Sequence, residues 1–221
     1  MTTPAGRVGG EPVPAAWVGG EAVPAAWVGG EAVPAAWVDG EPVPATEVSA
    51  ELARLRAGPR AARLPADGTP DGRQLRRWVT QRVVLRRLLD HEAAARGLPP
   101  PEADDPPPEA DGPRPDPALV GSAAADVLAT SPVARAVYRA VTADLAVPEA
   151  DVRDHYDRNL DRYGHLPYPR ARTLVEAAVV EHRRQRTFAR WLDAQAASRI
   201  RLAPGYEHPA DPRQPDATHR H

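Results

Sequence analysis

The side chains best suited to metal chemistry lie at the C-terminal end of the chain. Residues 204–221 carry three histidines and two aspartates, namely His208, Asp211, Asp216, His219 and His221. Imidazole nitrogens and carboxylate oxygens are ligands for divalent transition metals. The segment is also rich in proline, and without a preorganised pair of ligands such a site binds metal weakly. We therefore expect a tail that holds no metal and no cofactor, with His208, His219 and His221 as weak candidates.

Two other segments match catalytic motifs only in part. His91 and Glu92 begin the HExxH pattern of zinc proteases, but Ala95 stands where the second histidine is required. Ser122 does not lie in the G-x-S-x-G turn that exposes the nucleophile of a serine hydrolase. The chain has no cysteine, which excludes thiolate nucleophiles and thiolate metal sites. These patterns favour a protein without a catalytic residue.

The distribution of charged and apolar residues argues against two classes of partner. The formal net charge is −2, and the arginines alternate with acids instead of forming the basic stripe of a nucleic-acid-binding protein. No run approaches the ~18 apolar residues of a membrane-spanning helix, and the first residues lack the apolar stretch of a signal peptide. We therefore expect neither a nucleic-acid partner nor a membrane partner, and a cytoplasmic location.

A tandem repeat of ten residues occupies the N-terminal part of the chain. Its copies are VGGEPVPAAW at 8–17, VGGEAVPAAW at 18–27 and 28–37, and VDGEPVPATE at 38–47. Paired glycines and a central proline predict a short extended segment and a turn rather than a helical repeat. We interpret the first three copies as a tandem expansion and predict that residues 1–37 are poorly ordered and dispensable. The alternative is a ligand-stacking ladder made by Trp17, Trp27 and Trp37.

The composition of the remaining chain predicts an all-α fold, because alanine, leucine and arginine dominate it. Asp71 is a suitable N-cap and Gly97 a suitable residue after the last helical turn, which predicts a helix of about 24 residues. At ~100° per residue, its apolar side chains fall in an arc of about 140°. These side chains are Trp78, Val84, Leu85, Leu88 and Leu89. The proline-rich residues 99–117 that follow predict a stiff, solvated linker.

Capping signals divide the chain after the linker into further helices. Before the linker, a short helix carrying Leu52 and Leu55 is also expected, ahead of the helix that starts near Asp71, with Ser49 as its cap. Ser131 and Pro132 predict a break between two helices, and Pro148 predicts the first residue of another. A long helix is expected from about Pro169 to Arg199. Its predicted apolar face consists of Leu174, Val175, Ala178, Phe188, Ala189, Leu192 and Ala196.

Three motifs in this order resemble the chaperone module of SurA/PrsA-type peptidyl-prolyl isomerases, which are parvulin-bearing foldases. The first, an opening V-N/D-G segment, is matched by Val38, Asp39, Gly40, Val43 and Glu47. The second, a long helix, is matched by Leu75, Val79, Leu85, Leu89, Ala95, Gly97 and Leu98. The third, which ends in Y-x-x-N-x-x-x-F/Y, is matched by Val147, Asp151, Val152, Tyr156, Asn159 and Tyr163. His155 and Pro148 depart from the third motif.

The resemblance implies a helical, chaperone-like module with a long C-terminal helix and without the catalytic domain. In the family the parvulin domain follows the third motif, but here the terminal helix follows Tyr163 almost directly. The implied organisation is repeats (1–37), a first half-module (38–98), a linker (99–117), a second half-module (118–203) and a tail (204–221). The alternatives are a retained isomerase activity and a metal-responsive accessory protein.

The implied partner is an unfolded or extended polypeptide. We expect it to bind in an apolar groove between the long helices. The candidate groove residues are Trp78, Leu85, Leu89, Tyr156, Tyr163, Phe188 and Trp191. The alternative for each of them is that it packs in the protein core, where large apolar side chains most often lie.

Overall fold

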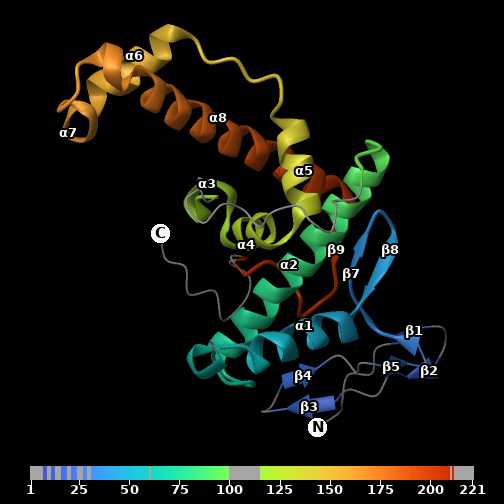
Figure 1. The fold of residues 1–221 in the computed structure, drawn as a ribbon. Coiled ribbons are helices and arrows are strands. Elements are labelled where there is room, and N and C mark those ends of the chain that lie inside the picture. The colour runs from blue at the N-terminus through green and yellow to red at the C-terminus, as the bar shows by residue number, and fades with distance from the viewer. Residues whose placement is uncertain are drawn as a thin grey trace. The chain divides into compact units, whose positions relative to one another are not determined.

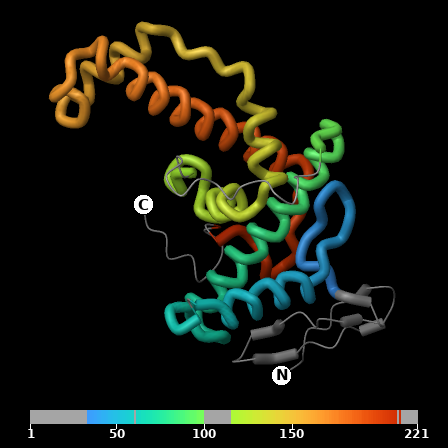
Figure 2. The backbone as a smooth tube through the Cα atoms, in the orientation of Figure 1, coloured from blue at the N-terminus to red at the C-terminus, as the bar shows by residue number. Residues whose placement is uncertain are grey.

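The computed structural model describes residues 33–59, 61–99, 115–209 and 211, and the backbone alone of six short strands between residues 7 and 32. Figure 2 draws the fully described backbone in colour. The described chain is mostly helical, with a small three-stranded sheet that an all-α fold does not include. It forms two compact units, residues 1–88 with 198–221, and residues 89–197. Most of the predicted repeats, linker and tail lies outside the fully described residues.

The first unit contains the three-stranded sheet and the helices that follow its strands β7 and β8 in the chain (Figure 1). Its elements are β7 (Pro34–Val38), β8 (Glu41–Pro44), α1 (Ala45–Ala57), a 3₁₀ turn η1 (Ala61–Arg63), the first part of α2 (Pro70–Ala95), and β9 (Ile200–Leu202). The strand order is β8-β7-β9, and both pairings are antiparallel. Asp39 and Gly40 connect β7 to β8 with φ values of 53° and 83°, as a two-residue type I′ hairpin requires.

Earlier in the chain, the described backbone forms three further antiparallel pairs of short strands. The strands are β1 (Arg7–Val8), β2 (Glu11–Pro12), β3 (Ala16–Val18), β4 (Glu21–Val23), β5 (Trp27–Val28) and β6 (Glu31–Ala32), and they pair in sequence order. Val18 pairs with Glu21 and Val28 with Glu31, as Val38 pairs with Glu41. The prediction of extended segments is thus confirmed at the backbone of these strands, and the prediction of a turn is confirmed in the fourth copy, at Asp39 and Gly40. The side chains of Trp17 and Trp27 lie outside the described residues.

The ends of the first two helices agree only in part with the predicted capping residues. The prediction that Ser49 caps α1 is wrong, because this helix begins at Ala45, directly after β8, and Ser49 lies inside it. The cap of α2 is Thr69 rather than Asp71, since the Thr69 hydroxyl accepts a hydrogen bond from the Gly72 N–H at 3.0 Å. The predicted C-terminal role of Gly97 is confirmed by its φ of 61°. Its N–H donates to the Ala94 carbonyl and the next N–H to the Ala93 carbonyl, which satisfies the last turn.

The second unit contains the last turns of α2, most of α8 and, among the described residues, the five helices between them. They are α3 (Pro117–Val120), α4 (Ser122–Thr130), α5 (Pro132–Val141), α6 (Glu149–Arg158), α7 (Leu160–Tyr163) and α8 (Tyr168–Arg199). The predicted break at Ser131 is confirmed, because its hydroxyl accepts from the Ala134 N–H at 3.2 Å. Pro148 precedes α6 instead of opening it.

Burial along the long helices differs from the predicted faces at several positions. Val84, Leu85, Leu88 and Leu89 of α2 are buried as predicted. The predicted arc is too narrow, because further residues of this helix are also buried: Arg77, Val79, Thr80, Arg82 and Val83. On α8 the predicted burial of Val175, Phe188 and Leu192 is confirmed, whereas Leu174 is 56% exposed. Among the described residues, no helix is both long and apolar enough to span a membrane.

Candidate functional site

The candidate groove residues divide into two groups by burial. Four are in the core, with exposed fractions of 8% for Leu85, 1% for Leu89, 1% for Tyr163 and 0% for Phe188. A client could reach these four side chains only if the surrounding helices moved apart. In this conformation they are core residues, which was the alternative to a role in the groove. The other three, Trp78, Tyr156 and Trp191, are half-buried. For these three, contact with a client stays a prediction.

The half-buried aromatic residues contact neighbours within their own units. The Trp78 ring lies 5.0 Å from the Arg82 guanidinium carbon. The Tyr156 hydroxyl donates to the Leu166 carbonyl at 2.7 Å, and Tyr156 packs against the core that contains Tyr163. The Trp191 ring lies 5.4 Å from the Phe188 ring. The structure therefore brings Tyr156 to Tyr163 and Trp191 to Phe188. In each pair the aromatic residues already contact other parts of the protein itself.

A partly buried hydrogen-bond chain, for which the sequence pattern gave no prediction, adjoins Phe188. The Tyr138 hydroxyl donates to Glu181 Oε1 at 2.8 Å, and Gln185 Nε2 donates to the same oxygen at 3.0 Å. Gln185 Oε1 in turn accepts from the Asp116 N–H at 2.8 Å. Burial raises the pKa of the Tyr138 phenol far above its ordinary value, and the hydrogen bond to Glu181 raises it further. These groups satisfy one another, which is typical of a structural network.

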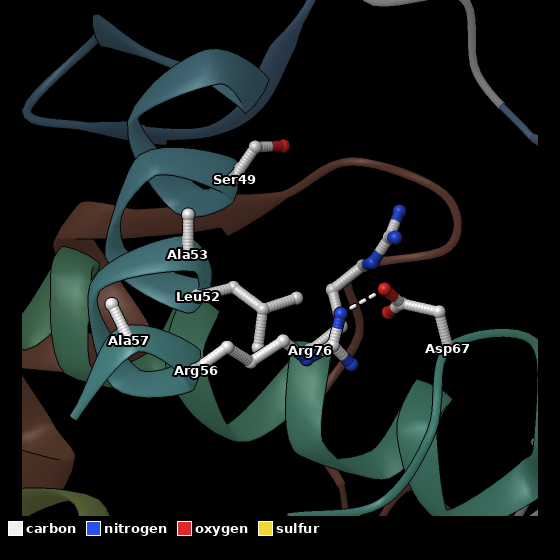
Figure 3. Close-up of a pocket in the computed structure, with 7 residues that line it drawn as sticks. All are labelled: Ser49, Leu52, Ala53, Arg56, Ala57, Asp67 and Arg76. Carbon is white, nitrogen blue, oxygen red and sulfur yellow. Dashed lines mark hydrogen bonds and ion pairs between the residues drawn. The ribbon is translucent and has the colours of Figure 1, made fainter. Parts of the chain in front are cut away.

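A hollow beside α1 offers space for a ligand (Figure 3). Its volume is about 500 Å³. The residues that line it are Ser49, Leu52, Ala53, Arg56, Ala57, Asp67 and Arg76. The first five share one face of α1 because residues three and four apart on a helix are neighbours. The other two come from the loop before α2 and from its first turns, so the connection between the helices completes the hollow.

The charges at the rim of the hollow are unequal. Figure 3 shows Arg56 facing Asp67, and these two side chains form an ion pair. Arg56 also donates to the Pro65 carbonyl at 3.2 Å. Burial raises the pKa of Tyr206, and Arg76, which donates a hydrogen bond to its hydroxyl, offsets part of this rise. Two guanidinium groups and one carboxylate leave the hollow with an excess positive charge.

The chemistry available in the hollow is binding rather than catalysis. Ser49 supplies the only side-chain hydroxyl among the lining residues, and no histidine lies among them to act as its base. Leu52, Ala53 and Ala57 supply apolar surface beside the two arginines. An arginine binds a carboxylate through two parallel N–H donors. The lining therefore suits a ligand that combines an apolar group with a carboxylate.

No metal site is found in the part of the chain that the structure describes, where no three His, Cys, Asp or Glu side chains gather. His208 is exposed and Asp211 follows it, three residues along the chain. His219, His221 and Asp216 lie outside the described residues, so the predicted character of the tail stays a prediction.

Comparison with known proteins places a family match on the same segment as the hollow. A family described as a "family of unknown function (DUF7158)" matches residues 34–71. The match covers β7, β8, α1 and η1 and includes every residue that lines the hollow except Arg76. No curated protein and no solved structure matches the chain.

Proposed function

We propose that this protein binds extended segments of other polypeptides without catalysing a reaction, as a non-catalytic relative of the SurA/PrsA-type foldases. The observation that carries the proposal is the hollow of about 500 Å³ beside α1, whose lining combines apolar residues with an excess of positive charge. Its volume falls within the range of roughly 300–1,000 Å³ that is usual for ligand sites in proteins.

The lining of the hollow specifies the chemistry of the bound segment. A carboxylate between Arg56 and Arg76 would neutralise the excess positive charge, and a neighbouring apolar side chain would cover Leu52 and Ala53. Adjacent side chains of an extended peptide point to opposite faces, so the two groups must stand two residues apart. We therefore propose a client segment of the pattern acidic-x-apolar.

The chain around Tyr163 supports binding without isomerisation. Tyr163 ends α7, and α8 begins at Tyr168, so residues 164–167 are the entire connection. A connection of this length is an ordinary loop and does not accommodate an inserted domain of about a hundred residues. The alternative of a peptidyl-prolyl isomerase would need another catalytic site within the chain.

The experiment that tests this proposal measures binding of a labelled peptide by fluorescence anisotropy. The probe is a fluorescein-labelled octapeptide with the central sequence Glu-Ser-Leu, and the control peptide has Gln in place of Glu. We expect the Glu peptide to bind more tightly, and Arg76→Gln to weaken its binding about tenfold, as loss of a charge-assisted hydrogen bond does. Arg63→Gln is the matched control, because Arg63 is exposed in η1 and does not line the hollow. Equal binding of the two peptides, or equal loss in the two variants, would overturn the proposed site.

A further inference from the structure

Two other segments of the chain have the same sequence as strand β7. β7 reads Pro-Ala-Ala-Trp-Val, and residues 14–18 and 24–28 repeat it without a difference. In each case two residues and then a glutamate follow in the sequence, and the valine before them pairs with that glutamate. Each of these segments therefore carries the same backbone groups and side chains from which β7 is built.

The neighbour of β7 on its other side is β9, and most contacts between them use features that all three segments share. The Ala203 N–H donates to the Ala35 carbonyl at 2.9 Å, and Val38 stands opposite Ile200 in the register. The Arg201 guanidinium carbon lies 4.3 Å from the centre of the Trp37 ring. Backbone groups, alanines, valine and tryptophan recur in every segment, so these contacts do not distinguish one copy from another.

One contact of β9 is possible with the fourth copy alone. Arg199 donates from Nε to Asp39 Oδ1 and from Nη2 to Asp39 Oδ2, each at 2.7 Å. The equivalent residues of the other copies, Gly9, Gly19 and Gly29, have no side chain to accept these bonds. The side chains of Arg199 and Asp39 are 21% and 32% exposed, so water screens the pair only in part.

We propose that β9 is a docking strand for the repeated Pro-Ala-Ala-Trp-Val segment, and that the Asp39–Arg199 ion pair assigns β9 to the fourth copy. Arg201 recognises the tryptophan that the segments share, and Arg199 recognises the aspartate that only one copy carries. Direct continuity of β8 with α1 also favours the fourth copy, because docking of the third copy leaves residues 35–44 as a connection to α1. The proposal concerns pairing within the chain and does not rest on the proposed function.

The experiment traps each pairing in the full chain with an engineered disulfide. The protein has no cysteine, so an introduced pair is the only one that can form. Val38→Cys with Ile200→Cys reports the observed pairing, because residues directly opposite in an antiparallel sheet lie at disulfide distance. Val28→Cys with Ile200→Cys reports docking of the third copy. Each pair is equilibrated in glutathione buffer, and mass spectrometry gives the cross-linked fraction.

The selecting contact is then removed or moved in both cysteine backgrounds. Asp39→Asn abolishes the charge while asparagine still tolerates the positive φ of the turn. We expect it to raise the ratio of third-copy to fourth-copy cross-link about tenfold, and Gly29→Asp added to it to raise the ratio about tenfold again. Asp71→Asn, at an exposed position outside the sheet, should leave the ratio unchanged. If Asp39→Asn and its combination with Gly29→Asp leave the ratio as unchanged as the control Asp71→Asn does, continuity with α1 alone fixes the pairing and the proposal is wrong.

Discussion

Removal of the Glu51 carboxylate should unfold the first unit at much lower denaturant concentration than the wild type. Glu51 of α1 is 6% exposed and faces Arg82 of α2, which is 5% exposed. Arg82 Nη1 lies 3.1 Å from Glu51 Oε1, and Arg54 Nη1 lies 2.8 Å from Oε2. Glu51→Ala therefore leaves the buried Arg82 guanidinium without this carboxylate.

The structure sets the size of the effect. At 3.1 Å and an effective dielectric constant of 20, the Glu51–Arg82 attraction is about 5 kcal/mol. The Trp78 ring, 5.0 Å from the Arg82 guanidinium carbon, still compensates part of the charge in the variant. We therefore expect Glu51→Ala to lower the free energy of unfolding by about 3 kcal/mol, at the lower end of the range for broken buried pairs.

The assay is urea denaturation followed by circular dichroism, with a matched variant on the same two helices. Glu47 pairs with Arg87 at 2.9 Å, but their side chains are 38% and 31% exposed, so Glu47→Ala should cost at most about 1 kcal/mol. Replacing both Glu51 and Arg82 by methionine should recover most of the lost stability, because the charge is then absent. Equal losses for Glu51→Ala and Glu47→Ala would refute the reasoning.

Two further predictions concern the second unit. Phe188 is 0% exposed and packs on Tyr138 and Trp191. In urea denaturation, Phe188→Ala should therefore lower the free energy of unfolding by about 3–5 kcal/mol. The control Leu174→Ala, at an exposed position, should lower it by less than about 0.5 kcal/mol. A loss below 1 kcal/mol for Phe188→Ala would contradict its place in the core. Burial and the bond to Glu181 raise the Tyr138 pKa, so the unfolded chain loses this proton at lower pH than the folded protein. The free energy of unfolding should therefore fall as the pH rises above about 10, and less steeply in Tyr138→Phe. Identical slopes would contradict the raised pKa.

Local signals in the sequence were sufficient for some helix ends of this protein but not for others. Gly97 and Ser131 end or begin helices where predicted, because each satisfies backbone groups within a few residues of itself. The predicted cap at Ser49 failed since packing of Ala45 and Val48, which are 4% and 1% exposed, starts α1 one turn earlier. Propensity alone gives no access to such tertiary contacts.

The contacts that complete the sheet and the hollow depend on residues distant in sequence. β9 follows α8 and pairs with β7, about 160 residues earlier, and the composition gave no sign of this pairing. Burial of Arg82 on α2 was equally hidden, because it depends on Glu51 of another helix. The sequence predicted a short helix that carries Leu52, which does line the hollow, but Arg76 of α2 reaches the hollow only through the fold.

Suppression of client aggregation tests the central claim of polypeptide binding at the hollow most directly. Light scattering of a chemically denatured client, diluted into buffer, is followed with the wild type and two α1 variants. Ala53→Trp fills the hollow from an exposed position, and Ala50→Trp places the same side chain at an exposed position of α1 that does not line it. We predict that the wild type and Ala50→Trp reduce scattering, and that Ala53→Trp does not. No reduction by the wild type, or an equal reduction by all three proteins, would contradict the account.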